Sequence, residues 1–117
     1  MNSERVGTKL VNRGGQLVII GLKTERGGTL VETSDGGVTQ VFGGLCYTTN
    51  KGELAPMFIN RDSSVWVAMG EVCYTGNPFR VLVREERDGK IREWKRGEVP
   101  VRFDFLQGSA LLYDGRR

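Results

Sequence analysis

Short runs rich in β-branched and aromatic residues, separated by turns of Gly, Asn and Asp, follow one another along the whole chain. The clearest runs are 16–23 (QLVIIGLK) and 65–69 (VWVAM), and the clearest turn is 35–37 (DGG). Such residues favour strands and tight turns, and no window has the apolar spacing of a helix. The pattern predicts an all-β fold, either a small antiparallel barrel or a sandwich.

The chain of 117 residues has the length of one domain, so we predict a single β domain over 1–117. Within it, 6–42 align with 69–106 at a spacing of about 63 residues, and 43–64 form an irregular connection. Equivalent positions in this alignment are Gly7 and Gly70, Val18 and Val81, and Glu32 and Glu93. The strand order of each half resembles small SH3-like barrels in pattern alone, without a family motif. The alignment predicts two duplicated β-meander halves, although any two sets of hairpins with Gly turns would align as well.

The first five residues, MNSER, lack the apolar segment of a signal peptide, and no apolar run approaches the roughly 18–20 residues that cross a bilayer. We therefore expect a cytoplasmic protein that does not contact a membrane. The two cysteines, Cys46 and Cys73, are expected to be reduced and buried. A single disulfide between them is the alternative.

Histidine is absent from the sequence, which removes the commonest general base and the commonest metal ligand. A Ser-His-Asp or Cys-His arrangement is excluded, and two cysteines cannot complete a four-ligand zinc site. The sequence also lacks a phosphate-binding loop and the glycine pattern of a dinucleotide fold. We therefore expect no catalytic residue, no metal and no cofactor, and the balance favours a protein that is not an enzyme.

Two acidic residues keep a catalytic or small-molecule hypothesis open. Glu32 and Glu93 are equivalent in the proposed halves, and a pseudo-twofold between the halves would bring their carboxylates together. Close carboxylates push one of their two pKa values upward, which suits acid-base chemistry. Together with Tyr47 they would line a pocket inside a barrel or at a dimer interface. The alternative is that each glutamate faces solvent beside a basic neighbour.

Basic residues are concentrated in the last third of the chain. Residues 79–103 hold eight Lys and Arg against five Asp and Glu, which accounts for the whole net charge of +3. The candidate nucleic-acid-binding residues are Arg80, Arg84, Lys90, Arg92 and Trp94. If these residues lie on one side of the hairpin that turns at 88–89, they would hold phosphates and stack a base. Because three glutamates are interleaved with them, the alternative is a solvated face of mixed charge.

The favoured function is a small non-catalytic module that binds or inhibits a protein, of the kind that phages and mobile elements encode. This hypothesis predicts an exposed apolar patch or an open edge strand, and an open edge would also favour a homodimer. The second hypothesis is a nucleic-acid-binding β-barrel that uses the basic face. The third is a small-molecule binder or enzyme. The sequence leaves the partner, protein or nucleic acid, undecided.

Overall fold

The computed structural model describes residues 2–3, 7–25, 27–47, 55–73, 79–95, 98, 101–105 and 108–117. Every regular element in this part of the chain is a β-strand, which confirms the all-β prediction. The strands are β1 (Asn2–Ser3), β2 (Leu10–Arg13), β3 (Gln16–Thr24), β4 (Val31–Ser34), β5 (Val38–Tyr47), β6 (Phe58–Arg61), β7 (Ser64–Val72), β8 (Val81–Arg87), β9 (Lys90–Lys95), β10 (Val101–Phe105) and β11 (Gly108–Gly115).

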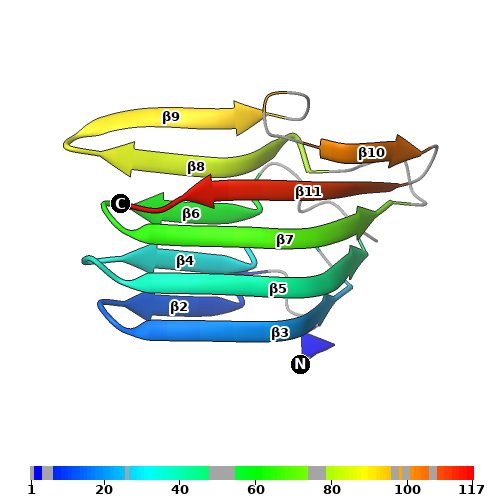
Figure 1. Cartoon of the computed structure of the whole chain (residues 1–117), viewed down its shortest axis with the longest axis horizontal. Coiled ribbons are helices and arrows are strands. Elements are labelled where there is room, and N and C mark those ends of the chain that lie inside the picture. The colour runs from blue at the N-terminus through cyan, green and yellow to red at the C-terminus, as the bar shows by residue number, and fades with distance from the viewer. Residues whose placement is uncertain are drawn as a thin grey trace.

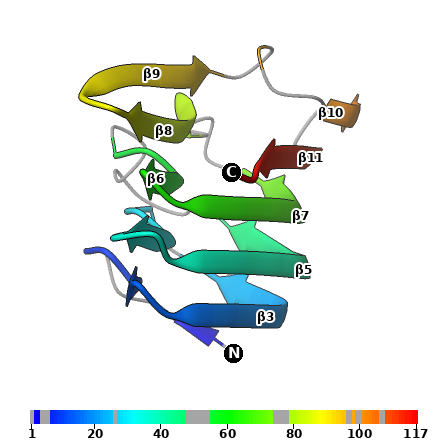
Figure 2. The same ribbon diagram turned by 60° about the vertical axis from the view of Figure 1, so that its left-hand side comes forward.

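The strands form two sheets that lie one in front of the other in Figure 1. The longer sheet has the order β1-β3-β5-β7-β11-β10 and the shorter sheet the order β2-β4-β6-β8-β9. From β2 to β7 the chain alternates between the sheets, so that β2 with β3, β4 with β5, and β6 with β7 each make one coil. Equivalent strands of successive coils pair in parallel, and the coils stack as a β-solenoid (Figures 1 and 2).

The two ends of the solenoid differ. At the C-terminal end, β8 turns into the antiparallel β9, and β11 returns antiparallel along β7 with β10 beside it. At the N-terminal end, β1 pairs with β3 only at Lys23 and Thr24. Counting the described strands alone, the first coil therefore pairs with far fewer neighbouring residues than the last.

Register partners identify one coil as the structural repeat. In the shorter sheet the successive partners are Leu10, Val31, Phe58 and Val83. The spacing is 21 residues (10 to 31), then 27 (31 to 58) and 25 (58 to 83), far from the expected 63 or so. The two SH3-like halves, 6–42 and 69–106, are wrong because their alignment places Val18 of β3 on Val81 of β8, and these strands belong to different sheets.

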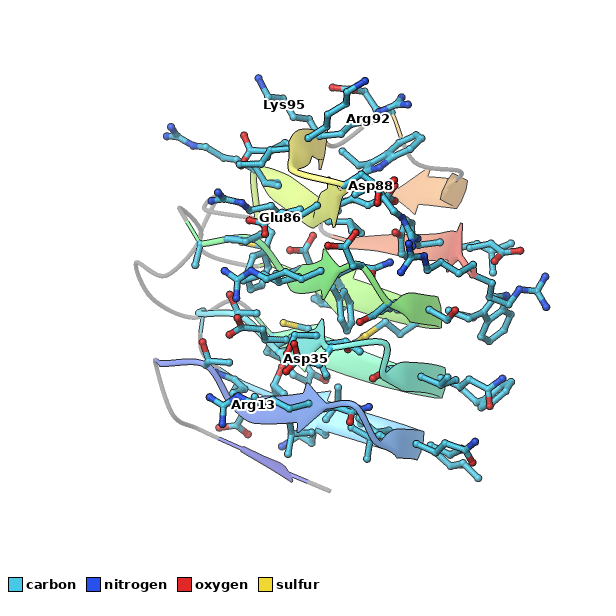
Figure 3. The ribbon with its side chains drawn as sticks, turned by 90° about the vertical axis from the view of Figure 1, so that its left-hand side faces the viewer. Arg13, Asp35, Glu86, Asp88, Arg92 and Lys95 are labelled. Atoms are coloured by element: carbon cyan, nitrogen blue, oxygen red, sulfur yellow. The ribbon has the colours of Figure 1, made fainter. Side chains whose placement is uncertain are left out.

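The antiparallel barrel is also wrong, because six of the nine pairings between described strands are parallel and the two sheets do not close. The turn at 35–37, read as a hairpin, instead carries the chain from β4 in one sheet to β5 in the other. Its chemistry is as expected, since Asp35 and Gly36 have φ values of 56° and 72°. Figure 3 shows Asp35 at this corner, next to the corner that holds Arg13. Such residues bend the chain whether the next strand pairs back or crosses over.

In its described residues, 43–47 and 55–64, the predicted irregular connection is largely regular. It contains the end of β5, the whole of β6 and the first residue of β7. Residues 48–54 of this connection lie outside the described part of the chain.

Apolar side chains from both sheets fill the space between them. In β7 buried and partly exposed residues alternate, so Val65, Val67 and Met69 point inward while Trp66 and Ala68 point outward. Phe58 of β6 is fully buried opposite them. Cys46 and Cys73 are thiols rather than halves of a disulfide, and Cys73 is only half-buried.

Among the described segments, no helix is long and apolar enough to span a bilayer. Nor do any three Cys, Asp or Glu side chains of the same segments gather closely enough to hold a metal ion.

A hydrogen-bonded polar group lies inside the last coils. Asn60 is fully buried, and its Nδ2 donates to Tyr113 Oη at 3.1 Å and to the Gly115 carbonyl at 3.2 Å. Tyr113 Oη donates in turn to Glu85 Oε2 at 2.6 Å. Burial, and then the bond to Glu85, raise the pKa of Tyr113 well above its usual value of about 10. The network joins β6, β8 and β11 across the two sheets.

Tyr113→Phe is expected to lower the free energy of unfolding by about 1–2 kcal/mol at pH 8, because it leaves Glu85 without its buried donor. The folded-state pKa of Tyr113 is raised, so its stabilisation is fully present below about pH 10 and declines as the unfolded chain ionises. The difference in free energy of unfolding between wild type and variant should therefore shrink by up to about 1.4 kcal/mol per pH unit above pH 10. Urea denaturation at pH 8 and pH 11 measures this difference. An unchanged difference would contradict a stabilising hydrogen bond from Tyr113 to Glu85.

Candidate protein-binding face

The outward side of the longer sheet is largely apolar. Strand register places Ile20, Phe42, Ala68 and Leu112 in one row across β3, β5, β7 and β11. We call the set Val18, Ile20, Val38, Phe42, Trp66, Ala68 and Leu112 the outer apolar face. Figure 2 shows the strands that carry it lying side by side. A sheet with one solvated side normally alternates apolar-in and polar-out, so this face departs from the usual pattern.

The exposure of the outer apolar face is high and increases toward β3. Phe42 is 42% exposed, Val18 55% and Ile20 78%. The rings of Phe42 and Trp66 pack against each other with their centroids 4.9 Å apart and their planes tilted by 40°. Aromatic and β-branched residues on neighbouring strands make favourable contacts, and these contacts hold the side chains of the face in position on the sheet.

No member of the outer apolar face is charged, but the exposed Asp114 lies directly beside Trp66 on the same side of the sheet, and the charges at the border are paired with each other. Lys23 Nζ and Glu25 Oε1 are 2.6 Å apart, and Arg116 Nη2 and Asp114 Oδ2 are 2.7 Å apart. The hydrogen bond to Arg116 lowers the pKa of the Asp114 carboxyl, so this pair stays charged at neutral pH. Its border is therefore electrically balanced, and its centre is apolar except for the uncharged Gln40, which register places between Val18 and Trp66.

The outward side of the shorter sheet is different, because it carries a ladder of alternating charges. Arg61 pairs with Glu32 and, at 3.2 Å, with Glu86, while Arg84 Nε lies 3.4 Å from Glu86 Oε1. These side chains are partly exposed and compensate one another across β4, β6 and β8. Such a face is well solvated and offers little apolar area to a partner.

The proposed basic face does not form as one surface. In the β8–β9 hairpin Arg84 lies opposite Glu93, whereas Arg92 lies opposite Glu85, so the two arginines are on opposite sides. Lys90 and Trp94 are on the side of Arg92, and Arg80 is exposed just before β8. Figure 3 shows Arg92 and Lys95 on β9 at the end of the solenoid farthest from Arg13.

Trp94 is also poorly placed to stack a base. Its ring is half-buried against the core, and the guanidinium of Arg92 lies 3.6 Å from the ring centroid. The cation therefore occupies the aromatic face that a base would need.

The three pocket candidates do not converge. Glu32 is engaged by Arg61, and register places it three strands from Glu93, which is about 14 Å at the usual strand spacing. Tyr47 ends β5 in the other sheet, with Lys23 Nζ 6.0 Å from its ring centroid. The paired-carboxylate arrangement is therefore wrong, because the pseudo-twofold that would create it does not exist.

Sequence reasoning missed the outer apolar face, although a signal for it was present. The near-continuous apolar run at 16–23 is the pattern of a central strand covered on both sides. The structure makes it β3, whose outward side is open and whose neighbour β1 is very short. Trp66, in the run at 65–69, lies half-buried on the outer apolar face.

Comparison of the chain with protein-family models, curated proteins and solved structures finds no match.

Proposed function

We propose that this protein is a non-catalytic protein-interaction module and that the outer apolar face is its docking surface. The observation that carries the proposal is the set of exposed and half-buried apolar side chains around the Phe42–Trp66 ring pair, interrupted only by Gln40 and bordered by Asp114. Exposed apolar patches rimmed by polar residues are typical of protein-binding sites. Tryptophan and other aromatic residues at the centre of such patches often supply most of the binding energy.

The chemistry of the face also indicates the kind of partner. Nucleic acid binds through cations that neutralise phosphates, and the outer apolar face has none. The balanced pairs Lys23–Glu25 and Asp114–Arg116 at its border give no strong field of either sign. The surface therefore fits a folded protein that presents a flat apolar patch with few charges. The inhibitor role, and an origin in a phage or mobile element, are compatible with such a partner.

A photocrosslinking amino acid at position 68, in the centre of the face, tests the proposal in the native host. The matched control carries the same amino acid at position 34, on the charged side of the shorter sheet. A partner that binds the outer apolar face will crosslink from position 68 and not from position 34. Equal crosslinking from both positions would argue against a specific surface.

The captured protein, once purified, allows the binding energy to be measured by calorimetry. Phe42→Asp combined with Trp66→Asp is expected to weaken binding by roughly 100-fold or more, because charge replaces the central aromatic pair. Arg84→Ala, on the opposite side of the molecule, should leave the affinity within a factor of about three. Unchanged affinity in the double variant would rule out this face as the docking surface.

A further inference from the structure

The N-terminal end of the solenoid is not covered like the rest of the core. Leu10 and Leu17 point inward in the first coil, but both are partly exposed. Their partners one coil further on, Val31 and Thr39, are 1% and 0% exposed. The core therefore reaches the surface at this end, where the apolar contacts of one more coil are missing.

The strand edge at the same end is also open. β1 pairs with β3 only at Lys23 and Thr24, so among the described strands none pairs with 16–22 on that side. Likewise β2 has β4 as its only described neighbour. Open edges present unpaired backbone N–H and C=O groups to any strand that can approach.

The residues of this edge do not protect it. Residues 16–22 (QLVIIGL) contain no charge and no proline. At the opposite end, β9 (KIREWK) carries four charged residues, which is the usual way to prevent edge pairing. One end of the solenoid is thus protected against strand addition, and the other is suited to it.

We propose that a second copy of this chain covers the N-terminal end, related by a twofold axis that makes β3 pair antiparallel with its own equivalent. When an uncharged strand pairs with its own copy, no like charges lie opposite each other. Self-pairing of a charged strand such as β9 would bring like charges together. A twofold axis through both sheets also brings β2 beside its equivalent and buries Leu10 and Leu17 of both copies.

The backbone geometry of β3 suits this pairing. The Val38 N–H donates to the Gly15 carbonyl at 2.8 Å, so Gly15 and every second residue after it direct their backbone groups toward β5. Gln16, Val18 and Ile20 therefore direct theirs toward the open edge. These groups are available to a second strand without disturbing the existing ladder.

The twofold also explains why the most exposed side chains of the outer apolar face lie on the edge strand β3. Ile20 and Val18 lie on the edge strand, where a single copy would be expected to have a polar rim. In the dimer the same residues lie near the centre of one continuous face formed by both copies. The inference does not depend on the proposed function, because it rests on the edge and core rather than on an outside partner.

Analytical ultracentrifugation of the full chain over a range of concentrations tests the proposal. A reversible species of twice the 13.0 kDa chain mass is expected. Val18→Pro should raise the dimer Kd by roughly 100-fold or more, because it removes an edge-directed N–H that the fold itself does not use. Ile20→Lys, at a side chain that is 78% exposed, provides a second disruption that leaves folding intact.

Phe42→Lys is the matched control, because it places the same charge on the outer face one strand away from the edge. It should leave the dimer within about threefold of wild type in Kd. Dissociation by Phe42→Lys but not by Val18→Pro would overturn edge pairing in favour of face stacking.

A chain that is monomeric at every concentration, or that grows beyond two copies, would also overturn the proposal. A monomer that still binds its partner through the outer apolar face would overturn the dimer and leave the proposed function standing.

Discussion

Asn60→Leu is expected to lower the free energy of unfolding by about 3–4 kcal/mol, although leucine has the same branched shape and the same number of heavy atoms as asparagine. The fully buried Asn60 side chain donates to Tyr113 and Gly115, and its Oδ1 accepts from the buried Ser63 N–H at 3.2 Å. Leucine can replace none of these bonds, and water cannot reach the Ser63 N–H. Urea denaturation at a fixed protein concentration measures the loss.

Asn12 provides a matched control, because it forms the same turn in the first coil. Its Oδ1 accepts from the Gly15 N–H at 3.0 Å, as Asn60 does from Ser63 three residues later. Gly15 is exposed, however, so water can take over its N–H and carbonyl in an Asn12→Leu variant. The variant also loses the bonds from Nδ2 to the Val38 carbonyl and to Thr39 Oγ1, but Thr39 keeps Thr33 Oγ1 as a partner at 2.8 Å. We expect Asn12→Leu to cost about half as much as Asn60→Leu. Equal losses, or a loss below about 1 kcal/mol at Asn60, would contradict the importance of burial.

The strands and turns could be predicted because their signals are local. The run at 16–23 corresponds to β3, the run at 65–69 lies within β7, and the turn at 88–89 joins β8 to β9. Gly21, within the run at 16–23, has a φ of 75°. β-branched side chains and residues that tolerate positive φ have these effects in any fold.

The topology could not be read from the same signals, because the turns at 35–37 and 88–89 have similar chemistry and different outcomes. Asp35 and Asp88 both have positive φ, yet only the second turn leads to a paired hairpin. Whether a turn leads to a hairpin or to a crossover depends on which side of the following strand is buried, and this depends on how the opposite sheet packs against it. The coil repeat was nevertheless visible: each of the first three coils has a small polar residue at the same register position, namely Asn12, Thr33 and Asn60.

The failure of the basic face follows from pairing geometry that the sequence does contain. A two-residue turn at 88–89 pairs 87 with 90, so each even-numbered residue of β8 faces an odd-numbered residue of β9. Arg84 and Arg92 are both even-numbered and must therefore lie on opposite sides. The outer apolar face was harder to foresee, because exposure of Val18 and Ile20 depends on β3 having almost no neighbour.

Gly44→Ala is expected to destabilise the protein by about 3–5 kcal/mol or to prevent folding. Gly44 has a φ of 132°, a region that is essentially restricted to glycine. It also lies directly against Leu22 of β3, so that an added Cβ would overlap the Leu22 carbonyl oxygen and lie 2.9 Å from its backbone nitrogen. Both atoms belong to the backbone and cannot move aside without separating β3 from β5.

Gly43→Ala separates the cost of the clash from the cost of positive φ. Gly43 has a φ of 71°, and a Cβ at this position would meet no atom within 4 Å. Alanine there should cost only about 1–2 kcal/mol, the usual penalty of the left-handed conformation. Urea denaturation of both variants measures the difference. Similar losses at the two positions would mean that the β3–β5 pairing can open to admit a methyl group. A much larger loss at Gly44 would mean that the close approach of β3 and β5 at this residue fixes how the first two coils stack.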